Sequence, residues 1–201
     1  MFPVANPFPK LAEFTLKLIL TNSHHFAHRP KLKYGPEAAS VAFRALSEFV
    51  FNSFTKDSGL EPRLLGNNFR VTGASVGKVD FELAIQKEHT NRLSTIHGGT
   101  LASLVDLGGS LAVASKGRFM TGVSTDINVV TYLNPGGKPG DIMTGTATCD
   151  KMGRTLAYTT VTFFNSKGEL AARGSHTKYI AKTWGSEDFV APEEYVAEEE
   201  K

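Results

Sequence analysis

The stretch NRLSTIHGGTLASLVDLGGS, residues 91–110, contains the strongest structural pattern in the chain. After its first two glycines, apolar and small residues recur every three or four positions, which predicts a helix with one buried face. Asp106 falls on the opposite side of this helix with Ser103 and Ser110, so we expect its carboxylate to face solvent or another molecule. The buried face consists of Leu101, Leu104, Val105, Gly108, Leu111 and Ala112.

Composition indicates an ordinary globular protein. A chain of 201 residues fits one domain with a short appendage, and 41% hydrophobic residues are enough to fill a core. No apolar run approaches the roughly 18 residues of a membrane span, and lysines and arginines form no dense stripe, so we expect no nucleic-acid partner.

The cysteine and histidine content argues against metal or disulfide chemistry. Cys149 is the single cysteine, so it forms no intramolecular disulfide, and we expect it to pack as a small hydrophobic residue. The cluster His24, His25 and His28 has no carboxylate or cysteine beside it, so we expect no metal site there. We expect no cofactor.

The chain is predicted to divide into three segments. Residues 1–36 are rich in proline and are interpreted either as an organelle-targeting extension or as a loosely docked arm, which leaves a cytoplasmic or a mitochondrial location open. Residues 37–183 form the domain, beginning with a helix over about 37–54. Residues 184–201 form an acidic tail, with seven acidic residues from Glu187 to Lys201.

Alternating segments predict one sheet. A hairpin is expected over about 69–85, turning at Ser-Val-Gly, and further strands over about 122–133, 141–151, 154–166 and 169–181. The order of helix, two strands, helix and four strands predicts an α+β fold with an antiparallel sheet and a central helix.

The central helix suggests a site shared between subunits. Its start, His97-Gly98-Gly99, places amides where the helix dipole favours an anion or a polarised carbonyl. Asp106 follows nine residues after His97, about 13 Å along a helix, too far for both to reach one carbon atom. A second subunit would have to supply one of the two, so we expect a homo-oligomer.

Three blocks resemble a known family: EHTNRLSTIHGGTLASLVD, TGVSTDINVVTYLNP and KMGRTLAYTTVTFFNSKGELAARGSHTKY. Across residues 40–181 the chain resembles the hotdog-fold acyl-CoA thioesterases, nearest to the branch of thioesterase superfamily member 2 and related to the phenylacetate-pathway thioesterases. The resemblance implies a hotdog fold, in which the sheet wraps the long helix, and a dimer of dimers acting on acyl-CoA. The short members of the family lack the first 40 or so residues.

The resemblance also implies catalytic roles. Asn91 and the amide of Gly98 would polarise the thioester carbonyl, and His97 would shape that pocket. Asp106 of the neighbouring subunit would act as general base on water or as nucleophile, with Ser124 positioning the water or the carboxylate.

The same resemblance implies a CoA-binding turn. Its basic residues would meet CoA phosphates, and its glycine would let the backbone approach them; without the other blocks, a solvated hairpin turn explains the same residues. Asp126, Tyr132 and Tyr179 would lie near the CoA or acyl groove. One extra residue between Asp126 and Tyr132 suggests a bulge there. The turn comprises Lys151, Met152, Gly153, Arg154, Thr155 and Leu156.

Two other functions compete with acyl-CoA hydrolysis. A dehydratase acting on acyl thioesters needs a histidine paired with an acid, typically further along the helix, yet Asp106 is the only acid between Glu88 and Asp126. A non-catalytic acyl-CoA-binding protein could use the same fold, but all the implied catalytic residues are present, which favours hydrolysis. His89, Thr90 and His176 are interpreted as structural.

Overall fold

The computed structural model describes residues 36–116, 118, 120–132 and 136–183. The predicted N-terminal extension, the histidine cluster at 24–28 and the acidic tail lie outside these residues, so the proposed division into three segments stays a prediction. Among the described residues, no helix combines the length and apolarity that crossing a bilayer requires.

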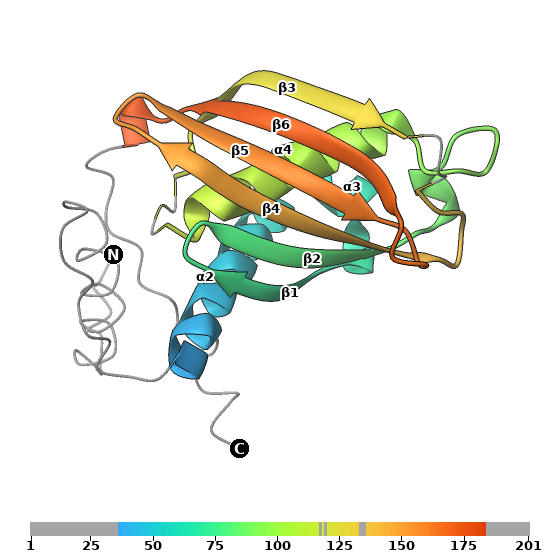
Figure 1. Ribbon diagram of the computed structural model, residues 1–201, viewed down its shortest axis with the longest axis horizontal. Coiled ribbons are helices and arrows are strands. Elements are labelled where there is room, and N and C mark those ends of the chain that lie inside the picture. The colour runs from blue at the N-terminus through green and yellow to red at the C-terminus, as the bar shows by residue number, and fades with distance from the viewer. Residues whose placement is uncertain (1–35, 117, 119, 133–135, 184–201) are drawn as a thin grey trace.

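Six strands form one antiparallel sheet around a central helix, as the alternation predicted. The sheet order is β1-β2-β4-β5-β6-β3, and β1 and β3 are its edges. Figure 1 shows the sheet curving over α4, with α2 at the β1 side. The main elements are α2 (Pro36–Asp57), α3 (Glu61–Leu64), β1 (Phe69–Ser75), β2 (Lys78–Ala84), α4 (Gly98–Ala114), β3 (Val123–Thr131), β4 (Ile142–Met152), β5 (Leu156–Phe164) and β6 (Leu170–Tyr179), with short 3-10 turns at Gly66–Asn68, Lys87–His89 and Ala181–Thr183.

A row of aromatic rings joins the N-terminal helix to the sheet. The ring centroids of Phe51 and Phe69 lie 4.7 Å apart, those of Phe69 and Phe81 5.2 Å, and those of Phe81 and Phe163 6.1 Å. These contacts run from α2 through β1 and β2 to β5, so α2 is part of the core rather than an appendage.

The predicted buried face of α4 is confirmed. Leu104, Val105 and Leu111 are fully buried, and α4 lies against β3, β4, β5 and β6. Gly174 on β6 makes this close packing possible, because a Cβ there would lie 2.2 Å from a methyl carbon of Val105.

The opposite face of α4 is only partly as expected. Ser103 and Asp106 are partly exposed, but Ser110 is buried. Its hydroxyl accepts a hydrogen bond from Lys178 of β6 at 2.8 Å. The helical periodicity placed Ser110 with Asp106 correctly, but the end of β6 covers that part of the helix.

The β3 strand carries one bulge, and its position differs from the expected one. Ser124 pairs with Lys178 and Asp126 pairs with Thr177, which leaves Thr125 as the extra residue. The prediction of a bulge between Asp126 and Tyr132 is therefore wrong, because the bulge lies between Ser124 and Asp126. An extra residue reverses the alternation of side chains: Ser124 reaches the helix, and Asp126 turns to the outer face.

Candidate active site

The carboxylate of Asp106 is held at one of its two oxygens. Ser124 donates a hydrogen bond to Oδ1 at 3.1 Å, and His176 Nε2 and Lys178 Nζ lie 3.4 and 3.8 Å from the same oxygen. Among the described residues, every such contact with this carboxylate falls on Oδ1. The side chain is 46% exposed, so Oδ2 remains available to a water molecule or a substrate.

His176 also belongs to the hydrogen-bonded group around Asp106. Its interpretation as a structural residue did not anticipate this contact. Its Nε2 lies 2.9 Å from Ser124 Oγ. The single hydroxyl hydrogen of Ser124 is donated to Asp106, so Nε2 must carry the hydrogen of the neutral imidazole and donate to Ser124. Burial and the nearby Lys178 lower the pKa of His176 to about 4, which keeps the ring neutral near pH 7.

A glycine on α4 makes room for this histidine. A Cβ at Gly109 would lie 2.5 Å from Thr159 Oγ1 and 2.7 Å from His176 Nδ1. Any side chain at position 109 would therefore push His176 away from Ser124 and Asp106.

Sequence reasoning missed both His176 and Lys178 as site residues. The two belong to the buried face of β6, since Arg173 and Ser175 before them are exposed and Thr177 between them is only partly buried. A histidine and a lysine at successive inward positions of a strand are a usable signal, because buried charges need a partner.

Two small pockets open beside Asp106. The first, about 190 Å³, has a mainly apolar lining and reaches towards the edge strand; the second, about 290 Å³, includes Lys178 and Ser124. Glu61 and Asp106 line both. Apolar side chains of the first pocket are Leu60, Leu64, Leu65, Ala102 and Ile127.

The residues at the start of α4 lie together at the surface. His97 caps the helix, its Nδ1 accepting from the Gly99 amide at 2.8 Å, so the neutral ring carries its hydrogen on Nε2. Gly98 is exposed, and a Cβ added there would meet no atom within 4 Å. The N–H of Gly98 belongs to the first helical turn, whose amides have no intrahelical acceptor. This amide can therefore donate to a bound group.

Asn91 lies in the loop before this helix and organises it. Its Oδ1 accepts from the Leu93 amide at 2.8 Å, and its Nδ2 donates to Thr95 Oγ1 at 3.0 Å. One amide hydrogen of Asn91 is thus used within the loop, which leaves the second for another acceptor.

Within one subunit, the helix start and Asp106 are not brought together. The helix is continuous from Gly98 to Ala114, so the separation of about 13 Å between His97 and Asp106 along the axis holds. The predicted catalytic residues therefore lie in two groups within one subunit, one at the start of α4 and one around Asp106.

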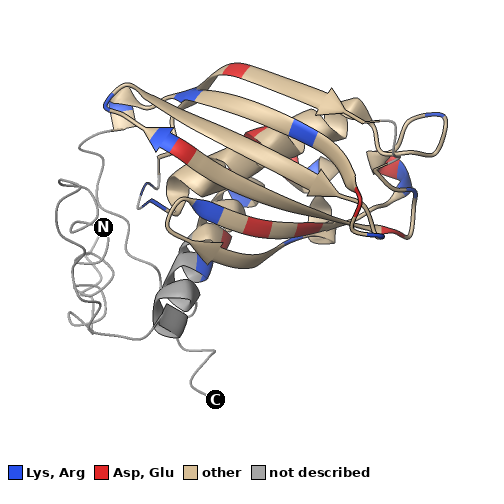
Figure 2. Cartoon of the chain, viewed as in Figure 1, with Lys and Arg blue, Asp and Glu red and all other residues tan. Residues whose placement is uncertain are grey.

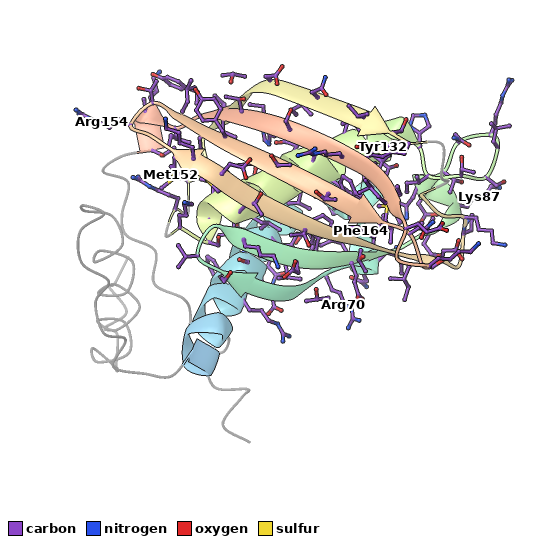
Figure 3. The ribbon with its side chains drawn as sticks, in the orientation of Figure 1. Arg70, Lys87, Tyr132, Met152, Arg154 and Phe164 are labelled. Atoms are coloured by element: carbon purple, nitrogen blue, oxygen red, sulfur yellow. The ribbon has the colours of Figure 1, made fainter. Side chains whose placement is uncertain are left out.

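The predicted CoA-binding turn is an exposed hairpin between β4 and β5. Lys151, Gly153 and Arg154 are exposed, and Arg154 points away from the sheet in Figure 3. A Cβ at Gly153 would meet only the Leu156 carbonyl oxygen, at 3.6 Å. The fold itself does not require a glycine there. Figure 2 shows acidic and basic residues together at the end of β4 that leads into this turn.

The other residues predicted to lie near the CoA or acyl groove are found at two different ends of the sheet. Tyr179 pairs with Leu156 and so lies beside the turn, and the Thr155 carbonyl accepts from the next amide, that of Ile180, at 2.8 Å. Asp126 lies two rungs away on the outer face. Tyr132 lies at the far end of the sheet from Arg154 (Figure 3), so one subunit does not bring these two together.

His89 and Cys149 are both buried, as their expected packing roles require. His89 is fully buried; its Nδ1 accepts from the Gln86 amide at 2.9 Å and its Nε2 lies 2.6 Å from the Leu64 carbonyl oxygen. Cys149 is buried, and burial raises the pKa of its thiol, which opposes a role as a nucleophile.

Comparison with known proteins places this chain in a family. The profile of the thioesterase superfamily matches residues 93–172. Human acyl-coenzyme A thioesterase 13 is 40% identical over 132 residues, which cover 65% of this chain and 91% of that protein. The chain belongs to the thioesterase superfamily. The prediction that it is a thioester hydrolase is thereby confirmed.

Solved structures agree on the architecture. Zebra fish thioesterase superfamily member 2 superposes with a TM-score of 0.59 at 38% identity, covering 65% of this chain and 93% of that one. The Escherichia coli PaaI protein from the phenylacetic acid degradation operon, at 20% identity and a TM-score of 0.54, covers 68% of this chain and 94% of that one and shares the fold. The predicted hotdog fold and family are confirmed.

Proposed function

We propose that this thioesterase hydrolyses acyl-CoA to a free acid and CoA, with Asp106 at the reacting centre. The observation that carries the proposal is the fixed Asp106 carboxylate, held at Oδ1 by Ser124 and open at Oδ2 beside an apolar pocket. The name of the human relative, an acyl-coenzyme A thioesterase, supports CoA as the leaving group.

The thioester carbonyl would be bound at the start of α4. The Gly98 amide and the remaining Asn91 amide hydrogen would donate to the carbonyl oxygen, and His97 Nε2 would shape the same pocket. Fixed donors of this kind stabilise the negative charge that develops on the oxygen, usually the largest contribution to catalysis.

Asp106 would act on the carbon of that carbonyl. As general base, its Oδ2 takes a proton from water while the water oxygen bonds to the carbon; the tetrahedral intermediate then collapses, and the C–S bond breaks to release the CoA thiolate. As nucleophile, Oδ2 itself bonds to the carbon, the C–S bond breaks and the CoA thiolate leaves; water then hydrolyses the resulting mixed anhydride to the free acid and regenerates the carboxylate. Ser124 would orient the carboxylate in either case.

Two subunits would build each site. The helix start and Asp106 are too far apart along α4 to meet one carbon atom, so each would work with its counterpart from a second copy. The open edge of β3 supports such pairing, since Val123 is 64% exposed and Val130 50% exposed. Dimers pairing into a tetramer would follow the arrangement that the resemblance implies.

The two ends of the substrate would lie in different surroundings. CoA phosphates would meet Lys151 and Arg154 in the 151–156 turn, with Tyr179 beside it and Asp126 nearby; Tyr132, at the other end of the sheet, would approach a site only in the assembled oligomer. The apolar pocket next to Asp106 would take a fatty or aryl acyl group.

The deciding experiment is release of free CoA thiol from short-chain, medium-chain, long-chain and aryl acyl-CoAs. We expect the native protein to hydrolyse at least one class and Asp106→Asn to lose nearly all of that rate while keeping its oligomeric state. Tight acyl-CoA binding without thiol release from any substrate would instead favour a non-catalytic acyl-CoA-binding protein.

A further inference from the structure

Lys178 is a buried lysine beside the proposed reactive carboxylate. It is 2% exposed, and its Nζ donates to Ser110 Oγ at 2.8 Å and lies 3.8 Å from Asp106 Oδ1. Ser110 is itself buried on α4, one helical turn after Asp106. The helix therefore provides both the anchor for the ammonium group and the carboxylate that faces it.

The titratable groups around Lys178 come from four elements. Asp106 faces it from α4, His176 lies two residues before it on β6, and Glu61 of α3 lines the same pocket. Asp126 of β3 lies near enough to His176 to act on that ring. Because His176 is neutral, Lys178 is the cation that the described residues place against Asp106.

The buried ammonium group of Lys178 depends electrostatically on Asp106. Burial lowers the pKa of Lys178, and the Asp106 carboxylate raises it. Burying an ammonium group costs free energy unless it is paired and hydrogen-bonded. A methionine of similar length would fill the same space without that cost, so packing alone does not account for a lysine here.

We propose that Lys178, anchored by Ser110, is a positioning residue that fixes Asp106 by a buried positive charge and leaves Oδ2 directed to the substrate. The inference rests on the proposed catalytic role of Asp106. Lys178 acts through Oδ1, on the side of the carboxylate away from the reacting atoms.

The experiment compares Lys178→Met with the native protein and with Lys78→Met. Lys78 is a matched control because it also lies close to an aspartate, Asp80, with an N–O distance of 3.1 Å, but on the exposed part of β2. We expect Lys178→Met to lower kcat at least about tenfold with KM within about twofold, since the charge acts on the reacting carboxylate. Lys78→Met leaves both parameters unchanged.

Two further readouts separate positioning from structural support. The pH–rate profile of the native protein should fall as Lys178 loses its proton, and Lys178→Met should lack that basic limb. The pKa of Lys178, followed by NMR of lysine labelled with ¹³C at Cε, should fall in Asp106→Asn because the carboxylate that raises it is gone.

A second variant and the Asp106→Asn control decide between the remaining explanations. Ser110→Ala keeps the charge but removes its anchor, and should give a smaller loss of kcat; it also serves if Lys178→Met does not fold. Unchanged kcat and pH profile in both variants, or a Lys178 pKa indifferent to Asp106→Asn, would overturn the inference. Full activity of Asp106→Asn would instead overturn the proposed function itself.

Discussion

Ser124 Oγ donates a hydrogen bond to Asp106 Oδ1 at 3.1 Å, joining the edge strand β3 to the central helix. The same hydroxyl receives the Nε2 hydrogen of His176 at 2.9 Å. Three side chains from three elements therefore form one directed chain of hydrogen bonds ending at the carboxylate. The bulge at Thr125 matters here, because it turns Ser124 towards the helix and Asp126 away from it.

Removing the Ser124 hydroxyl should lower turnover without unfolding the protein. In Ser124→Ala the carboxylate loses its hydrogen bond to β3, so we expect kcat to fall about 10²-fold, with KM little changed. Steady-state kinetics with the best acyl-CoA and a thermal melt measure the two effects. Ser124→Thr, which keeps the hydroxyl, is the control; equal losses in both variants would contradict the role of the hydrogen bond.

The stability of the protein should decrease in mild acid because of His176. Its folded pKa of about 4 lies below the ordinary value of 6.5, so between these values the unfolded state binds more protons than the folded state. The contribution of the neutral ring is present above pH 6.5 and is lost as pH falls towards 4. Between pH 7.5 and 5 this amounts to about 2 kcal/mol.

Urea unfolding of the native protein and of His176→Gln, at both pH values, tests this difference. The variant should lose about 2 kcal/mol less on acidification. An identical loss in the two proteins would show that His176 does not remain neutral in the folded state.

Two glycines of α4 should respond to alanine in opposite ways. Gly109→Ala places a Cβ against Thr159 and His176, so we expect a destabilisation of about 1–3 kcal/mol. Gly98→Ala meets no atom within 4 Å and should leave stability unchanged or raise it by up to about 1 kcal/mol. Chemical denaturation of both variants compares them, and similar stability would contradict the close approach of His176 to the helix.

Loss of the basic residues in the 151–156 turn should weaken binding rather than chemistry. We expect Lys151→Gln and Arg154→Gln to raise KM for acyl-CoA several-fold while kcat changes little, and to weaken binding of free CoA in a salt-dependent way. Lys87→Gln is the control, because Lys87 lies at the opposite end of the molecule from Arg154 in Figure 3. Titration calorimetry with CoA measures binding; an equal effect of the control would assign it to overall charge.

Mixed oligomers should recover activity if two subunits share each site. Asn91→Ala and Asp106→Asn are each expected to be nearly inactive. After equal amounts are unfolded and refolded together, half of the dimers carry one of each chain, with one intact site of two, so about a quarter of native activity should return. No recovery, with mixed dimers shown by mass spectrometry, would mean that each chain builds its own site.

The sequence by itself determined the strands, the central helix and the buried face of that helix. Alternation over residues 69–85 and 122–181, and the three-and-four spacing after Gly98, predict the strands and α4, because side-chain periodicity follows directly from backbone geometry. The same spacing shows that Asp106 does not belong to its own core. The resemblance to the thioesterase family then implies that Asn91, Gly98 and Ser124 act together with Asp106 in catalysis.

Only the tertiary structure decided what surrounds that aspartate. His176 and Lys178 lie about 70 positions further along the chain, and no local pattern relates them to Asp106. The sheet order places β6 beside β3 and under α4, and the bulge at Thr125 sets which β3 residue reaches the helix. Strand pairing and bulges depend on contacts between distant segments, so their consequences appear only in the folded chain.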